Sequence, residues 1–159
     1  MIRFHFVSLL AGICALGLLP AFAQPHHGEG DGSSSPAIRH LDAESAHGLA
    51  SGAGMGLARA AELNGYPGPK HAVELAEQLS LSQRQLTRLQ TLELQTIARA
   101  RELGRQILDE ELRLQQAFED ATIDQEKLTR FLERISSLRG QLRSVHLAAH
   151  LRAARMLNA

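Results

Sequence analysis

The sequence predicts an all-α fold, in which a long antiparallel helical hairpin follows a short preceding helix and is expected to dimerise. Two observations predict the hairpin. Apolar residues recur at three- and four-residue steps on both sides of a short polar turn at 119–124, and no proline interrupts the chain after Pro69. A third observation is that no segment alternates between apolar and polar residues as a strand would.

The first 23 residues have the pattern of a secretory signal peptide. Met1-Ile2-Arg3 supplies a positive start, an almost uncharged apolar run covers 4–19, and Ala21-Phe22-Ala23 ends in a small-residue cleavage pattern. A membrane anchor is the alternative, but the apolar run is short for a helix that spans a bilayer. We therefore expect cleavage after Ala23 and a periplasmic mature protein.

Cleavage would change what the mature chain can do. Cys14 is the only cysteine and would leave with the signal, so no disulfide or thiolate ligand would remain. Losing Arg3 from 17 Lys and Arg residues, against 17 Asp and Glu residues, leaves the mature chain one unit negative. That balance predicts no nucleic-acid partner.

Residues 24–40 are predicted to be a flexible tail, because a segment rich in His, Gly and Ser buries too little apolar surface to order itself. His26-His27 could capture a metal ion, but we favour an exposed tail that happens to hold two histidines.

Residues 41–68 are predicted to be a weakly structured connector. A short helix is expected over Leu41–Ala50 with Asp42 as its N-cap, and another helical turn over Leu57–Leu63. The glycine-rich segment 51–56 lies between them. Glycine-rich loops that bind phosphate follow a β-strand. No strand-like segment precedes residues 51–56, so a connector is favoured.

Residues 69–159 are predicted to form the helical hairpin domain. Pro69 suits the first position of a helix that runs to about Leu79, and the long helix then runs from Ser82 to about Phe118. The polar turn follows, and Asp124 or Thr122 caps the last helix.

A capping box starts the long helix. The Ser82 hydroxyl can accept a hydrogen bond from the Gln85 backbone N–H, while the Gln85 side chain reaches back to the Ser82 N–H. Leu81 and Leu86 are placed to form a hydrophobic staple across the same turn.

Each long helix carries an apolar seam. The first seam is Leu89, Leu92, Thr96, Ala100, Leu103, Ile107, Leu114 and Phe118, and the second is Leu128, Phe131, Ile135, Leu138, Leu142, Val145 and Ala149. Other leucines lie off the seams: Leu94, Leu108, Leu112, Leu132, Leu147 and Leu151. Because a thin two-helix layer cannot bury these as well, we expect a homodimer.

The Leu81-Ser82-x-x-Gln85 box in an exported helical chain resembles the hallmark of the Spy/CpxP periplasmic family, L-T-x-x-Q, with Ser in place of Thr. The likeness covers about Tyr66 to Ala159 and extends to periplasmic heavy-metal resistance and sensor proteins. Leu157-Asn158-Ala159 begins a second copy of the motif and stops before its Gln, so the C-terminus could be truncated. The resemblance implies either ATP-independent binding of unfolded proteins or of a membrane sensor protein, or metal binding through His and carboxylate ligands.

Four residues are predicted to form a metal site: His71, Glu93, His146 and His150. The two last-helix histidines are spaced i, i+4, and a hairpin that turns near Ala121 brings them level with Glu93. The helix that begins at Pro69 reverses direction near Ser80, which places His71 at a similar level along the hairpin. Imidazoles with a carboxylate suit zinc, nickel, cobalt or copper(II).

The resemblance to the metal sensors supports this set, although Leu75 stands where it implies a second histidine. The alternative is that His146 and His150 face water beside the seam and Glu93 is an ordinary helix charge.

The sequence thus favours a periplasmic protein that responds to envelope stress or heavy metals and binds divalent metal. A Spy/CpxP-like chaperone or modulator of a sensor kinase is the alternative. An enzyme is the least favoured class, since no nucleophile or organic-cofactor motif accompanies the histidines. The arginines of the long helix are expected mostly to face solvent, with a client-binding surface as the alternative.

Overall fold

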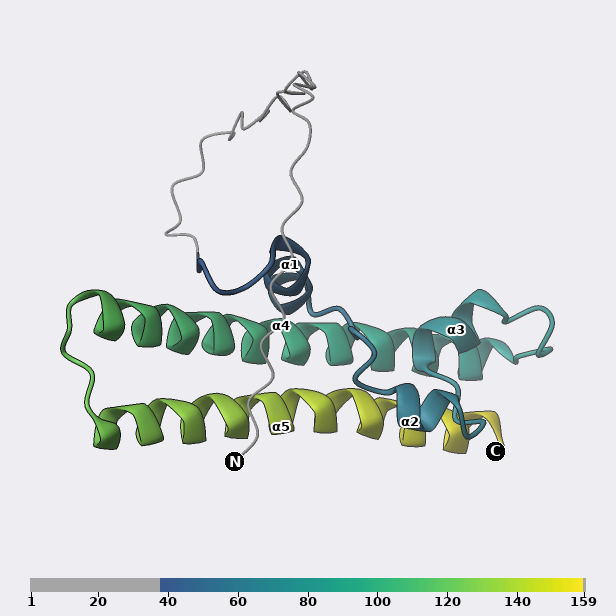
Figure 1. Cartoon of the computed structure of the whole chain (residues 1–159). Coiled ribbons are helices and arrows are strands. Elements are labelled where there is room, and N and C mark those ends of the chain that lie inside the picture. Colours follow the sequence, from purple (N-terminus) through teal and green to yellow (C-terminus); the bar gives the residue numbers. More distant parts are fainter. Residues whose placement is uncertain (1–37, 159) are drawn as a thin grey trace, which may run out of the picture. The chain divides into compact units, whose positions relative to one another are not determined.

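The computed structural model describes residues 38–158, and within that range all regular secondary structure is helical (Figure 1), as predicted. The predicted signal peptide, with Cys14, and residues 24–37 of the predicted tail, with His26-His27, lie outside the described residues. None of the described helices combines the length and apolar character needed to span a bilayer. The helices are α1 (Ala43–Ser51), α2 (Arg59–Glu62), α3 (Pro69–Glu74), α4 (Gln83–Glu119) and α5 (Gln125–Leu157).

The two long helices, α4 with 37 residues and α5 with 33, run antiparallel beside each other (Figure 1). At the end away from the turn, Gln85 Nε2 donates to the Met156 carbonyl over 3.0 Å. Nearer the turn, an Arg139 guanidinium nitrogen lies 2.8 Å from Glu111 Oε1. The Gln85–Met156 contact agrees with the register expected from a turn near Ala121.

The predicted helix starts are confirmed. Ser82 and Gln85 form the full capping box, in which the Gln85 N–H donates to the Ser82 hydroxyl over 3.3 Å and the Ser82 N–H donates to Gln85 Oε1 over 3.1 Å. Asp124 caps α5 by accepting from the Lys127 N–H over 2.7 Å. Asp42 caps α1 by accepting from the Ser45 N–H, also over 2.7 Å.

The core consists of two apolar clusters along the helix pair. The first is Leu49, Ala100, Leu103, Ile107, Leu138 and Leu142. The second, nearer the chain's C-terminal end, is Ala72, Leu89, Leu92, Ala149 and Ala153. Most of each predicted seam is thus buried. The prediction that Phe118 belongs to the buried seam is wrong. It lies in the last turn of α4, before the chain leaves the helix pair, and is 56% exposed.

The short helix α1 packs across α4 (Figure 1), so the range expected to be a weakly structured connector contains a packed helix as well as α2. Leu49 of α1 joins the first core cluster. The contact depends on Gly104 in α4, where an added Cβ would lie 1.9 Å from the Leu49 carbonyl oxygen. The backbone of α1 therefore rests directly on the backbone of α4.

Helix α3 is shorter than predicted, since it ends at Glu74 rather than near Leu79. The chain tightens into successive turns after Leu75 and closes with Ser80 at a left-handed φ of 50°. The Leu81 N–H then donates to the Ala76 carbonyl over 3.0 Å, a bond that satisfies an unpaired carbonyl at the end of the turn. This reversal delivers Leu81 to the start of α4.

We predict that Gly104→Ala destabilises the fold by about 1–3 kcal/mol, because the new methyl group must displace the backbone of α1. The matched control is Gly140→Ala in α5, where nothing lies within 4 Å of the added Cβ. That change should stabilise the fold by about 0.5–1 kcal/mol through helix propensity. Urea unfolding of both variants measures the effects. Equal stabilities for the two variants would contradict the close approach between the backbones of α1 and α4.

Candidate metal centre

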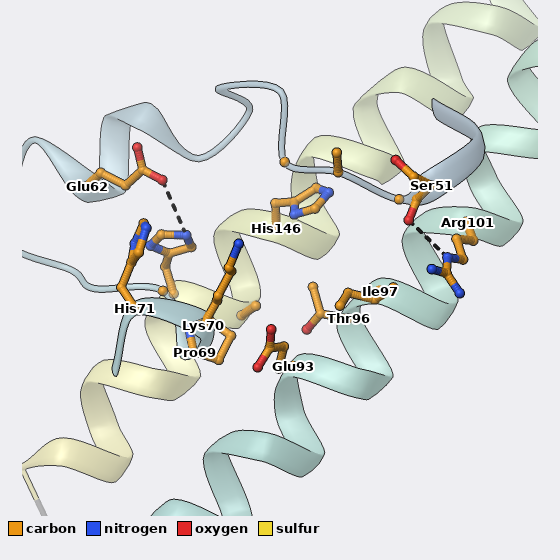
Figure 2. Close-up of a pocket in the computed structure, with 16 residues that line it drawn as sticks. Ser51, Glu62, Pro69, Lys70, His71, Glu93, Thr96, Ile97, Arg101 and His146 are labelled. Carbon is orange, nitrogen blue, oxygen red and sulfur yellow. Dashed lines mark hydrogen bonds and ion pairs between the residues drawn. The ribbon is translucent and has the colours of Figure 1, made fainter. Parts of the chain in front are cut away.

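All four residues of the predicted metal site line one pocket of about 410 Å³ (Figure 2). His71 comes from α3, Glu93 from α4, and His146 and His150 from α5. The loops around Gly54 and Gly68 complete the lining. Along the helix pair, the pocket lies between the two apolar clusters.

His146 and His150 occupy the face of α5 that packs against the rest of the fold. Their exposed fractions are 8% and 7%, so the alternative in which they face water is wrong. One helical turn separates them, which places both imidazoles on the same side of α5. The antiparallel register brings Glu93 and Thr96 of α4 to the same pocket.

His150 is held by a backbone hydrogen bond. Its Nδ1 lies 2.7 Å from the Tyr66 carbonyl oxygen, and because a carbonyl only accepts, Nδ1 must carry the proton. The other ring nitrogen, Nε2, faces Glu62, whose Oε1 is 3.9 Å away (Figure 2). A Cβ at Gly68 would approach Nε2 to 2.9 Å, so glycine leaves this nitrogen accessible.

A ring nitrogen of His146, Nε2, is buried without a hydrogen bond within the part of the chain that the structure describes. Burial, together with the nearby His150, lowers the pKa of His146 below its ordinary value. The neutral imidazole is therefore favoured, and no hydrogen bond within the described residues offsets the burial of Nε2.

The charges around the histidines are balanced. Glu62 and Glu93 line the pocket together with Lys70 and Arg101. Arg101 is engaged elsewhere, since its Nε donates to the Ser51 carbonyl over 2.9 Å. Lys70 Nζ lies 3.8 Å from Glu74. A cation that enters the pocket therefore meets two carboxylates and the ammonium group of Lys70.

The candidate ligands share the pocket without converging. Between residues 38 and 158, no group of three or more His, Cys, Asp or Glu side chains is close enough to hold a metal ion. Zinc–nitrogen bonds are about 2.0–2.1 Å long, so side chains would have to move inward to ligate. Whether the four predicted residues bind metal stays a prediction.

Sequence reasoning missed two groups at this site, Glu62 and the Tyr66 carbonyl. Both belong to the segment between α1 and α3, and α2 packs against α5. No periodicity or cap in that segment indicates that it lies over His150.

No family model, curated protein or solved structure matches the chain. The resemblance to the Spy/CpxP family therefore remains a prediction that depends on the Leu81-Ser82-x-x-Gln85 box.

We predict that the folded state loses stability as the pH falls below about 6.5, and that His146 causes part of this loss. The pKa of His146 is lowered in the folded state, so the unfolded chain binds its proton first. Each pH unit below the ordinary histidine pKa then costs up to about 1.4 kcal/mol. Urea unfolding at about pH 7.5 and about pH 5.5 measures this loss.

His146→Gln should make the fold less sensitive over this pH range, whereas the control His47→Gln, at an exposed position of α1, should not. Glu111 also has a lowered pKa, but its contribution is lost only as the pH falls below its ordinary value of 4.5. An unchanged pH dependence in His146→Gln would rule out the buried neutral imidazole as a cause.

Proposed function

We propose that this protein is an exported, periplasmic protein that binds a divalent transition metal in the pocket lined by His71, Glu93, His146 and His150, and that it acts in heavy-metal resistance or sensing. The observation that carries the proposal is the arrangement of His150. Its Nδ1–H is fixed by the Tyr66 carbonyl, while Nε2 faces Glu62 inside the pocket. A backbone carbonyl that orients the non-ligating nitrogen is a recurrent feature of histidines that bind metal.

The proposed ligands are His150, His146 and Glu62, with His71 and Glu93 as further donors in the same pocket. A bound metal would cross-link α5 to the short elements that precede α4. Imidazole and carboxylate donors suit zinc, nickel, cobalt and copper(II). The buried Nε2 of His146 would gain a partner, which favours binding.

Two features limit the affinity. The Glu62 carboxylate and His150 are separated by 3.9 Å, so Glu62 must approach when metal binds. Lys70 also lines the pocket and must move away from it when metal binds, because its ammonium group repels a cation even though it lies 3.8 Å from Glu74. Both adjustments are side-chain movements on short helices, and neither requires the long helix pair to unfold.

We predict that His146→Ala combined with His150→Ala abolishes metal binding, measured by calorimetry with zinc, nickel, cobalt and copper. In the unaltered protein, metal at a hundredfold above the dissociation constant should stabilise the fold by about 2.7 kcal/mol. Binding should weaken below about pH 6, because a protonated imidazole cannot ligate. Glu62→Gln should weaken binding and leave the fold intact.

The matched control is His47→Ala, which removes an exposed imidazole from α1. Deleting residues 24–37 should likewise leave binding unchanged. If that deletion alone removes binding, His26-His27 is the ligand and the pocket is not. If none of the four metals binds the untagged protein, the metal proposal fails.

A second candidate function, an ATP-independent chaperone, is favoured by the large apolar side chains that remain exposed. They are Met55, Leu63, Tyr66, Leu75, Leu79, Leu94, Phe118, Leu132 and Leu151. Leu94 is the clearest case in the long helices, with 70% of the side chain exposed. The same side chains could pack in the homodimer that the sequence predicts, so unfolded clients and a second copy would compete for them.

We predict, for this second function, that the protein suppresses aggregation of an unfolded model protein at near-stoichiometric amounts without ATP or metal. Replacing Leu94, Leu132 and Leu151 by Gln should weaken the suppression, because apolar contacts would bind the client. The double variant of His146 and His150 serves as the control and should suppress aggregation normally. Absence of suppression at large excess would exclude the chaperone function.

A further inference from the structure

Three arginines meet at the end of the hairpin away from the turn. Arg88 of α4 and Arg152 and Arg155 of α5 line a hollow of about 260 Å³, together with Met156. All three arginines are exposed. Across the described ranges, none of them makes an ion pair or a side-chain hydrogen bond, which leaves their guanidinium groups available to a ligand.

Several other arginines of the hairpin contact a carboxylate: Arg105 with Glu102, Arg113 with Glu110, Arg130 with Glu126 and Arg139 with Glu111. The stretches of sequence that carry the three arginines contain no acidic residue. Residues 78–92 and 134–158 contain no Asp or Glu, and Arg84 adds a further positive charge one turn before Arg88.

Helix stabilisation does not account for the charge on the α4 side. The N-terminal end of a helix carries a partial positive charge, so cations there are unfavourable. Yet α4 has no acidic residue in its first turn and places Arg84 there, with Arg88 one turn further along. Three guanidinium groups around one hollow also repel one another. An anion that enters the hollow would relieve both repulsions.

We propose that the hollow lined by Arg88, Arg152 and Arg155 binds a phosphate group. A guanidinium group presents paired N–H donors that match two oxygens of a phosphate, and each such pair is a charge-assisted hydrogen bond. Arginines from both helices surround the ligand, and Met156 offers an apolar contact to the organic group beyond the phosphate. The phosphate belongs either to a small soluble molecule or to the headgroup of an anionic lipid.

The first measurement is calorimetric titration of the full mature chain with inorganic phosphate, in a buffer with chelator so that metal plays no part. Arg88→Gln combined with Arg152→Gln should weaken binding by about tenfold to a hundredfold, the loss expected for hydrogen bonds to a charged group. Both positions are exposed, so the fold should persist, and circular dichroism checks this. Substitution by Lys at the same two positions retains the charge but removes the paired donors, and should restore binding only in part.

The matched control is Arg99→Gln combined with Arg143→Gln, which removes one exposed arginine from each long helix and none from the hollow. This variant has the same net charge as the test variant and should bind phosphate normally. Equal weakening in both variants would show general charge attraction and overturn the proposal.

The second measurement identifies the source of the phosphate. Vesicles of phosphatidylglycerol and phosphatidylcholine in equal parts are sedimented with the protein, beside vesicles of phosphatidylcholine alone. Binding to the anionic vesicles that is lost in the test variant and retained in the control variant supports a lipid headgroup. Binding of inorganic phosphate with no vesicle binding supports a small soluble ligand. If neither probe binds, the proposal is wrong.

Discussion

The structure depends on the pairing of α4 with α5, because this is the most extensive contact between helices in the described part of the chain. Apolar seams on the two helices bury one another, and this burial supplies the main driving force for the fold. The pairing also fixes the register. Leu89 and Leu92 pack in one cluster with Ala149 and Ala153. This packing fixes which residues of α4 and α5 lie opposite one another between the two clusters.

The candidate site occupies the place where this seam is interrupted. Between the two apolar clusters, α5 turns His146 and His150 inward, and the loops at Gly54 and Gly68 close over them. Burying a polar nitrogen without a partner costs about 1–3 kcal/mol, which an apolar side chain at His146 would avoid. This cost is the physical support for the ligand that we propose at this place.

A second buried polar group has a structural explanation. Glu111 is 7% exposed, and burial by itself would raise its pKa, but hydrogen bonds from Arg139 and His40 outweigh burial and lower the pKa. His40 precedes α1, and the neighbouring Arg39 contacts Glu119. These contacts tie the chain before α1 to the turn-side half of α4. Glu111 is thus satisfied within the fold, whereas His146 is not.

The sequence by itself determined the helix starts and most of the seam, because capping and helical periodicity act between residues three or four positions apart. The seam and the turn also placed His71, Glu93, His146 and His150 at one level of the hairpin, where they line a single pocket without converging on one point. Only the tertiary structure decided the rest. Glu62 and the Tyr66 carbonyl reach His150 through a segment with weak local signals, and Gly104 matters only because α1 crosses there. Such contacts join residues far apart in the chain, and no local pattern records which segment packs over another.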